Sequence, residues 1–500
     1  MRAFLLYRDR NFDQDAALPP NEPALRQDLE LDILFKAMAG DDAFLFDVAR
    51  KVILSSETEP ETILYRQEIL RDCQAYGPVV REMYALSVEA IEREGKHLWR
   101  WADYSRVILP RAVDVLRMLV GVLQRLQAIT NAQGDKFKSA GFSELFGMLR
   151  TELSDEYFAE VPARLGELNF RDGVLLSAEL GTGNKGTNYL LRREATKQGR
   201  WMERVFAQKA PVYTLTIDSR DEHGARAVSE LSETGMNLVA NALAQSADQI
   251  LGFFRMLRTE LAFYVGCLNL EARLVAKGEP LCFPTPAALR ERRLSFGGLY
   301  DVCLSLSVEQ RAVGNEVNAD GKQLIVITGA NQGGKSTFLR SVGLAQLMMQ
   351  SGMFVAATSF EANVCEGVFT HFNREEDAAM KSGKLDEELR RMSAIVDWIS
   401  HDSLMLFNES FASTNEREGS EIAGQIVGAF VEKGIKILFV THMFEFTQRL
   451  YDKKMAGSLY LRAEREDDGR RTFRLFESAP ERTSFGEDLY DRIFGPGAPN

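Results

Sequence analysis

Cysteine and histidine are scarce in this chain of 500 residues, with five of each. The cysteines are widely spaced and include no C-x-x-C pair, which indicates reduced thiols in a cytoplasmic protein and gives no sign of a structural zinc site. No stretch approaches eighteen consecutive apolar residues, and the first residues carry too many charges for a secretory signal. We therefore expect no membrane span and a cytoplasmic location.

Basic charge is also in deficit, since 60 Lys and Arg stand against 72 Asp and Glu and leave a net charge of -12. This balance excludes a protein coated in basic surface for non-specific nucleic-acid binding. It does not exclude a local basic stripe, because phosphate contacts need only a few well-placed cations. Hydrophobic residues make up 45% of the chain, enough for a sizeable core, and the length predicts two to four domains.

The chain from about residue 20 to 157 has helical periodicity, with prolines at 60, 78 and 110 as expected helix starts. Two groups of apolar residues each fall on one helical face: Val80, Met83, Tyr84, Val88 and Ile91, and then Leu116, Leu119, Val120 and Leu123. The period changes from about 168 to 217, where 174–176 and 212–217 resemble strands, and helical patterning returns over 227–276. This order suggests a long helical arm interrupted at its tip by a small β insert.

The stretch between the two expected strands is rich in base, including Lys185, Arg192, Arg193, Lys197 and Arg200. These residues could contact DNA, or they could be a solvated loop. The same region contains a G-x-G-x-x-G pattern over 181–186, which we expect to be a flexible loop because no βαβ unit surrounds it.

Prolines and glycine at 278–286 predict a linker. Beyond it, strand-like and helical runs alternate, which is typical of an α/β layer with a mainly parallel sheet. Residues 329–336 match G-x-x-x-x-G-K-[ST] in full, between a strand-like run and a helical one. Glycines let backbone N–H groups wrap phosphates closely, and the following helix N-terminus favours their negative charge.

This P-loop pattern predicts ATP and Mg²⁺ as cofactors. Lys335 would reach the β- and γ-phosphates, and the Ser336 hydroxyl would bind Mg²⁺. The residues expected around the nucleotide are Gly329, Ala330, Asn331, Gln332, Gly333, Gly334, Lys335, Ser336 and Thr337.

Two further strand ends carry polar residues in the right order along the chain. Glu409 follows the apolar run 404–407 and is placed to orient or deprotonate the attacking water. Asn408 stands where an acidic metal helper is usual, so we expect weaker Mg²⁺ handling, slower hydrolysis, or both; Ser336, Asn408 and Glu409 form the predicted metal set. His442 ends the next strand-like run and could sense the γ-phosphate.

Together these residues resemble the MutS family of DNA mismatch-repair and recombination ATPases, over about residues 295–490. The matching stretches are TGANQGGKST, NESFASTNEREGSEIA, VTHMFEF and TFRLFESAPERTSFG. Asn315 sits where the family carries an Asn that helps hold the nucleotide. The resemblance implies an ATPase that works as a homodimer, with each nucleotide sandwiched between one P-loop and the partner's signature region, and it extends more loosely to the family's lever.

The chain also departs from the family pattern. Residues 411–413 stand where the family often has Gly-Arg-Gly, and 383–385 stand about where a Ser-containing signature would reach the partner's γ-phosphate. The chain begins almost at once with the expected lever, which leaves no room for a mismatch-reading module. Phe142 and Glu144 match the letters of the Phe-x-Glu wedge, but they lie in a helical pattern, so we interpret the match as chance.

The predicted fold is multidomain: an α-helical lever with a small β insert, and an α/β P-loop (ABC-like) ATPase domain. The expected ranges are 1–167 for the lever, 168–225 for the clamp-like insert, 226–285 for the returning helices and linker, and 286–500 for the ATPase. We expect the nucleotide cycle to be coupled to binding of branched or distorted DNA rather than mismatches. The alternative is a nucleotide-driven dimeric clamp on a protein partner, without DNA binding.

Overall fold

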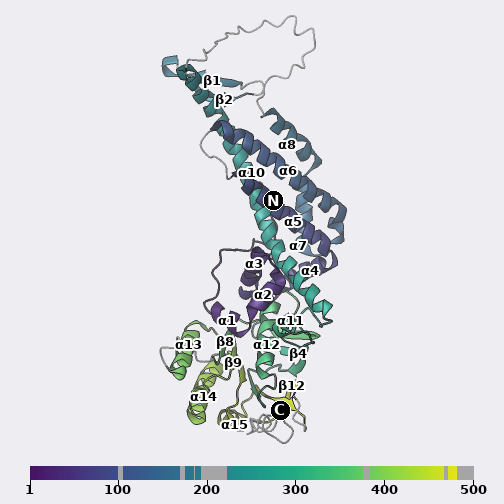
Figure 1. Ribbon diagram of the computed structural model, residues 1–500, viewed down its shortest axis with the longest axis vertical. Helices are drawn as coiled ribbons and strands as arrows, with labels where there is room; N and C mark the ends of the chain where they lie inside the picture. Colours follow the sequence, from purple (N-terminus) through teal and green to yellow (C-terminus); the bar gives the residue numbers. More distant parts are fainter. Residues whose placement is uncertain are drawn as a thin grey trace, which may run out of the picture. The chain divides into compact units, whose positions relative to one another are not determined.

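A computed structural model describes residues 1–98, 105–168, 175–184, 186–192, 222–374, 383–466 and 471–480 (Figure 1). The fold is mixed helix and sheet, and it divides into two compact units. The first comprises Met1–Ala3, Arg81–Phe137 and Ser143–Arg258, and the second comprises Phe4–Val80, Lys138–Phe142 and Thr259–Asn500. Across the described helices, none is both long and apolar enough to cross a membrane. The four ranges expected from the sequence stay a prediction.

The first unit is built mainly from long helices. They are α5 (Gly77–Leu98), α6 (Ser105–Gln133), α7 (Ala140–Glu152), α8 (Asp155–Glu167) and α10 (Glu222–Ala276), the ends of some belonging to the second unit. The expected apolar face of α6 is buried from Leu116 to Leu123. On α5 the expected face is only partly right, because Leu86 and Ala90 are buried while Val88 and Ile91 are half-buried.

Prolines mark the starts of two of the three predicted helices. Pro60 is the first residue of α4 (Pro60–Ala75), and Pro78 is the second residue of α5. Pro110 was wrongly expected to begin a helix, since α6 starts at Ser105 and continues through it. The long buried face of α6 outweighs the loss of one helical hydrogen bond near its start.

The described part of the β insert is an antiparallel pair, β1 (Leu176–Leu180) and β2 (Gly186–Leu191). The G-x-G-x-x-G pattern connects these two strands, which agrees with a loop and not with a βαβ nucleotide unit. Arg192 is exposed, and its Nε donates to the Ser177 hydroxyl at 2.8 Å. Outside the described residues lie the expected strand 212–217 and the other predicted DNA contacts: Lys185, Arg193, Lys197 and Arg200.

The match to a mismatch wedge at residues 142–144 falls inside α7. Phe142 is fully buried there, so it is a core residue rather than a side chain presented to a ligand. This placement agrees with the interpretation of the match as chance.

The second unit combines short N-terminal helices with an α/β part. The N-terminal helices are α1 (Glu22–Asp28), α2 (Leu31–Ala39), α3 (Ala43–Leu54) and α4, and the later ones are α11 (Val302–Ser307), α12 (Lys335–Gln350), α13 (Lys384–Trp398), α14 (Glu416–Glu432) and α15 (Phe444–Asp452). Buried Arg66 joins the N-terminal segment to the α/β part: its Nε donates to the Leu6 oxygen at 2.8 Å, and its Nη1 donates to the Ser351 oxygen at 3.3 Å.

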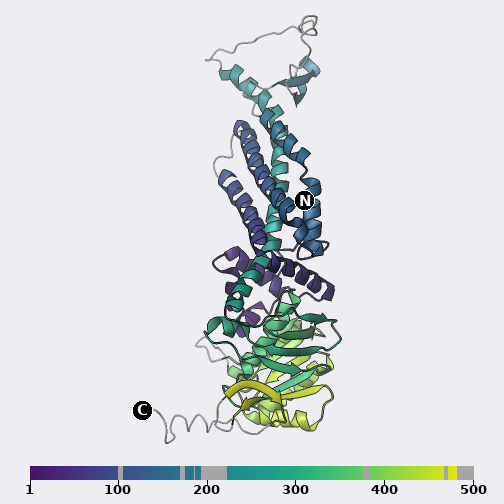
Figure 2. The ribbon, with the colours of Figure 1, turned by 90° about the vertical axis from the view of Figure 1, so that its right-hand side faces the viewer.

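In the described part of the chain, the main sheet has six strands in the order β12-β11-β6-β10-β9-β8. Their bounds are β6 (Leu324–Thr328), β8 (Val368–Phe372), β9 (Leu404–Asn408), β10 (Lys436–Val440), β11 (Ser458–Arg465) and β12 (Arg471–Glu477). Five strands are parallel, and only β12, the yellow strand at one edge in Figure 2, runs antiparallel to its neighbour. The expected mainly parallel sheet is therefore confirmed.

A smaller sheet corrects the predicted linker. Its order is β3-β7-β4-β5, with bounds β3 (Thr285–Ala287), β7 (Ser359–Asn363), β4 (Leu294–Leu299) and β5 (Asn315–Asn318). Part of the expected linker is thus an edge strand, with Pro286 buried. An edge strand tolerates proline because the missing N–H can face away from the ladder.

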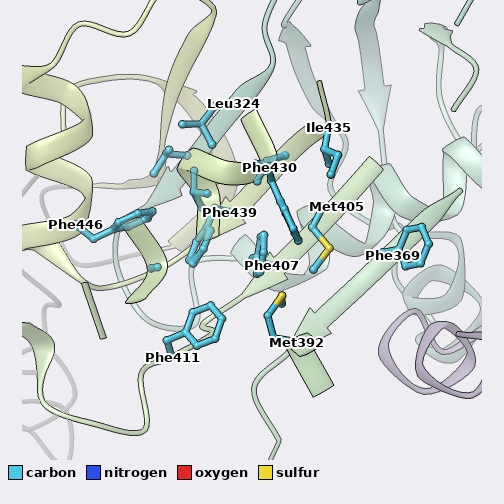
Figure 3. Packing of buried hydrophobic residues seen from close by; sticks show 14 of the residues in the cluster. Leu324, Phe369, Met392, Met405, Phe407, Phe411, Phe430, Ile435, Phe439 and Phe446 are labelled. Atoms are coloured by element: carbon cyan, nitrogen blue, oxygen red, sulfur yellow. The ribbon is translucent and has the colours of Figure 1, made fainter. Parts of the chain in front are cut away.

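An aromatic core fixes the strand ends that matter for the site (Figure 3). Phe407 of β9 and Phe439 of β10 stack with ring centroids 4.8 Å apart, and Phe430 of α14 and Phe446 of α15 pack beside them. Such dense packing leaves little freedom for the residues that follow β9 and β10.

Candidate functional site

The loop of residues 329–334 leaves the fully buried strand β6 and leads into α12. Gly329 has φ 114°, and a Cβ there would lie 2.8 Å from the Ala463 amide nitrogen, so only glycine fits. Gly334 also lies in the left-handed region, with φ 84°. The loop therefore has the strand–turn–helix form in which a helix N-terminus faces an anion.

Lys335 is held inside the curve of this loop, with 5% of its surface exposed. Its Nζ donates to the main-chain oxygens of Gly329 and Ala330, each at 2.9 Å. Burial lowers the pKa of the Lys335 ammonium, and the charge of Glu409 opposes that change. A buried cation lies where the sequence predicts the phosphates.

Ser336 links the loop to the end of β9, because its hydroxyl donates to Asn408 Oδ1 at 2.9 Å. The sheet explains how residues far apart in sequence meet. Strand β10 lies between β6 and β9, and its Val440 is in register with both Ile327 and Asn408. The carboxyl ends of the three strands therefore share one edge of the sheet.

Glu409 and His442 face each other at this edge. Glu409 Oε2 lies 3.9 Å from His442 Nδ1, and the two side chains are 33% and 45% exposed. The Glu409 backbone has φ 52°, and its amide donates to the Val440 oxygen at 2.9 Å. The structure thus brings Glu409 and His442 to the sheet edge that carries Asn408 and that Ser336 contacts from α12.

A cavity of about 740 Å³ opens beside the loop. Its lining includes residues 331–337, Glu409 and Asn315, together with an apolar wall that sequence reasoning missed: Leu299, Tyr300, Leu304, Val308, Val313 and Phe473. This volume lies within the range of small-molecule and cofactor sites, and an apolar wall facing a polar loop is their usual composition. No local motif marks the wall, because its residues come from separate segments.

Asn315 reaches this cavity in a particular way. Its Oδ1 accepts the Leu475 amide at 2.8 Å, and its Nδ2 donates to the Phe473 oxygen at 3.3 Å. The side chain therefore holds β12 against the cavity and keeps Phe473 in its wall.

The oxygen donors of α12 and of the end of β9 suit Mg²⁺. The Ser336 hydroxyl, the Asn408 amide oxygen and the Glu409 carboxylate are hard ligands of the kind that this cation prefers. Only Glu409 carries charge among them. Within the described ranges, no cluster of three or more His, Cys, Asp or Glu forms a separate metal site.

Phe411 and Gly383 are two of the positions at which the sequence departs from the MutS pattern. Phe411 is fully buried and has φ 63°, a conformation that glycine adopts at less cost. Gly383 caps the N-terminus of α13. Residues 375–382, which precede it, lie outside the described part of the chain.

Two family models match separate stretches of the chain. Residues 58–277 match the MutS2 N-terminal domain, and residues 325–494 match MutS domain V. These stretches include α4 to α10 in the first case and the loop, β9, β10 and β12 in the second.

Similar proteins with assigned names also indicate the MutS family. The "DNA mismatch repair protein MutS" of Thermotoga maritima is 36% identical over 140 residues, 28% of this chain and 18% of that protein. The protein of that name from Thermus thermophilus is 24% identical over 499 residues, covering 91% of this chain and 59% of the relative. That of Porphyromonas gingivalis is 25% identical over 442 residues, 78% of this chain and 49% of the relative. The chain spans less than two thirds of the length of each of these relatives. It belongs to the MutS family.

Proposed function

We propose that this protein binds ATP in the cavity beside the loop of residues 329–334 and hydrolyses it. The observation that carries the proposal is the meeting of Lys335, Ser336 and Glu409 at one sheet edge, beside a cavity of about 740 Å³. The Lys335 ammonium inside the loop would counter the charge of the phosphates. The apolar wall, which includes Tyr300 and Phe473, would pack against the adenine ring of ATP.

Each side chain has a distinct role in this proposal. Ser336 and Asn408 would hold Mg²⁺, which supplies positive charge beside the β- and γ-phosphates. Glu409 orients the attacking water and accepts its proton, and His442, 3.9 Å away, senses the terminal phosphate. Because Asn408 is neutral, we expect turnover to be slower than with a carboxylate at this position.

Replacement of the proposed base tests this assignment. Glu409→Gln keeps the shape of the side chain but cannot accept a proton, so the variant should bind ATP and retain it unhydrolysed. Retention of labelled ATP and release of phosphate are measured for the wild type, for Glu409→Gln and for Glu432→Gln, a matched change at an exposed glutamate. Phosphate release by Glu409→Gln at the wild-type rate would show that Glu409 is not the base.

We further propose that the nucleotide cycle is coupled to DNA, specifically to branched or distorted structures. The family match and the name shared by the relatives support a DNA partner. In this proposal the protein is a homodimer, residues 1–167 and 226–285 form a lever, 168–225 a clamp-like insert and 286–500 the ATPase. ATP binding closes the dimer, and hydrolysis releases it.

Binding to duplex and branched DNA, measured over a range of salt, separates this proposal from its alternative. Phosphate contacts release counterions, so affinity should fall steeply with salt. Neutralising Arg192, Arg193, Lys197 and Arg200 should weaken binding and flatten the salt slope. Absence of binding even at about 50 mM salt would instead favour a clamp on a protein partner.

A further inference from the structure

A buried histidine lies behind the proposed catalytic edge, outside the cavity. His371 is the fourth residue of β8, in register with Phe407 of β9, and its side chain is fully buried. Its ring stacks on Phe411, with centroids 5.3 Å apart and planes at 18°. The family resemblance and the cavity lining give it no role.

Both ring nitrogens of His371 have polar partners. Nδ1 lies 2.7 Å from the hydroxyl of Ser410, the residue after Glu409, and Nε2 lies 3.0 Å from the main-chain oxygen of Glu388 in α13. Burial, with help from Arg391, lowers the pKa of His371 to about 3, so the ring is neutral. A carbonyl can only accept, which places the single ring proton on Nε2 and leaves Nδ1 to accept from Ser410. The Ser410 hydroxyl also lies 2.6 Å from the His371 main-chain oxygen and shares its proton between the two acceptors.

The turn that carries Glu409 needs such external contacts. Glu409 and Phe411, on either side of Ser410, both have left-handed backbones, with φ 52° and 63°. Residues with a Cβ adopt this conformation only when their surroundings enforce it. The enforcing contacts are the ring bond to Ser410, the stack on Phe411 and the Glu409 amide bond to the Val440 oxygen.

We propose that His371 is a positioning residue for the reaction: its bond to Ser410 fixes the turn that aims Glu409, and its bond to Glu388 ties that turn to α13. The inference rests on the proposed function, because it assumes that Glu409 serves as the base. His371 itself does not line the nucleotide cavity. Its loss should therefore reduce the rate of hydrolysis and spare nucleotide binding.

Two single variants and their combination test the inference in the full-length protein. His371→Phe keeps a stacking ring and removes both hydrogen bonds, while Ser410→Ala removes the partner hydroxyl with little change in volume. We expect each to lower kcat by roughly tenfold or more, because small misplacements of a catalytic group have effects of this size. The dissociation constant for ADP should stay within about twofold in each case.

The double variant should be slowed by less than the product of the two single effects, because both changes break the bond between His371 Nδ1 and Ser410, although each also removes one bond of its own. His401→Phe, at an exposed histidine, is the matched control and should leave both quantities unchanged. If the wild type hydrolyses ATP and both single variants keep its kcat, the inference is overturned but the proposed function is not. The same holds if the single variants lose only affinity for ADP. Absence of turnover in the wild type would overturn the proposed function, and the inference with it.

Discussion

Asn408 is a neutral ligand in the proposed metal site. Its Oδ1 accepts the Ser336 hydroxyl at 2.9 Å, so the two donors are already side by side. An amide oxygen offers a Mg²⁺ ion only a dipole, whereas a carboxylate in the same place offers a full negative charge. The negative charge available to a Mg²⁺ ion therefore depends on whether residue 408 carries an amide or a carboxylate.

Asn408→Asp should strengthen Mg²⁺ use. We expect the Mg²⁺ concentration for half-maximal ATP hydrolysis to fall by roughly tenfold, because a carboxylate adds attraction of about 1–2 kcal/mol at a partly solvated site. Titration of ATPase activity with Mg²⁺ measures the change, and Asn318→Asp provides the same charge change on an exposed strand end. An unaltered or higher Mg²⁺ requirement in Asn408→Asp would argue against a metal ligand here.

Glu260 gives the second unit a pH-dependent term in its stability. The buried carboxylate accepts the amides of Leu5, Leu6 and Phe12 at 2.5–3.0 Å, and burial nevertheless raises its pKa to about 7. A raised pKa means that the folded chain binds the proton more tightly than the unfolded chain. Stability from this group is therefore fully present below about pH 4.5 and is lost as pH rises through about 7.

Glu260→Gln removes this titration. The unfolding free energy of the wild type, relative to that of the variant, should fall between pH 5 and pH 8 by up to roughly 3 kcal/mol. Thermal unfolding of both proteins across this range measures the difference, with Glu432→Gln as an exposed control. A difference that is constant or grows with pH would mean that Glu260 has no raised pKa.

At the scale of residues, local patterns identified the candidate site only in part. The loop and the polar pair at the end of β9 could be found because their residues are contiguous and their spacing is typical of one kind of site. Tyr300, Phe473 and His371 could not be found, because each acquires its place from strand pairing and packing across distant segments. His371 carries no sequence signal beyond being a histidine in an apolar run.

The segment that follows α10 contacts the wall of the cavity. Just beyond α10, the Lys277 ammonium donates to the main-chain oxygens of Ser305, Val308 (2.6 Å) and Gln310 (3.3 Å). Glu279 Oε1 accepts the Ser305 hydroxyl at 2.7 Å and the Ala312 amide at 3.0 Å. Several residues of the segment 304–313 line the cavity, so Lys277 and Glu279, just after α10, hold one wall of the proposed nucleotide site.

Lys277→Met keeps the length of the side chain and removes its charge. The main-chain oxygens of Ser305, Val308 and Gln310 would lose a charged hydrogen-bond donor. The segment 304–313 should therefore become more mobile. We expect nucleotide affinity to fall by roughly tenfold, with kcat at saturation changed much less. Equilibrium titration with ADP measures this, and Lys453→Met at an exposed lysine is the control; equal affinities for wild type and Lys277→Met would show that the contact does not support the wall.

At the scale of elements, the sequence was informative where periodicity was long. The alternation beyond residue 300 predicted a parallel sheet, and the buried face of α6 was predicted residue by residue. The strand β3 was missed because Pro284 and Pro286 are typical of linkers, and strand pairing with β7 is not visible in a three-residue segment. The helix start predicted at Pro110 was wrong because the buried face of α6 begins before this proline and stabilises the helix through it.

At the scale of the whole chain, the two family matches cover different stretches, and each stretch contains different structural elements. Residues 58–277 match the MutS2 N-terminal domain and contain the long helices, while 325–494 match MutS domain V and contain the loop with Lys335. The MutS resemblance was accessible from the sequence because the motifs of the second stretch are specific. The division into two compact units was not, because residues 4–80 pack with residues beyond 259.

The proposed function depends on ATP occupying the loop that holds Lys335. Equilibrium binding of ATP with Mg²⁺ to the wild type, to Lys335→Ala and to Lys453→Ala tests this most directly. We expect the wild type and Lys453→Ala to bind alike, and Lys335→Ala to lose affinity by roughly tenfold or more, because it removes a buried cation from the phosphates. Binding by Lys335→Ala as tight as that of the wild type, or no binding by the wild type, would contradict the proposed function.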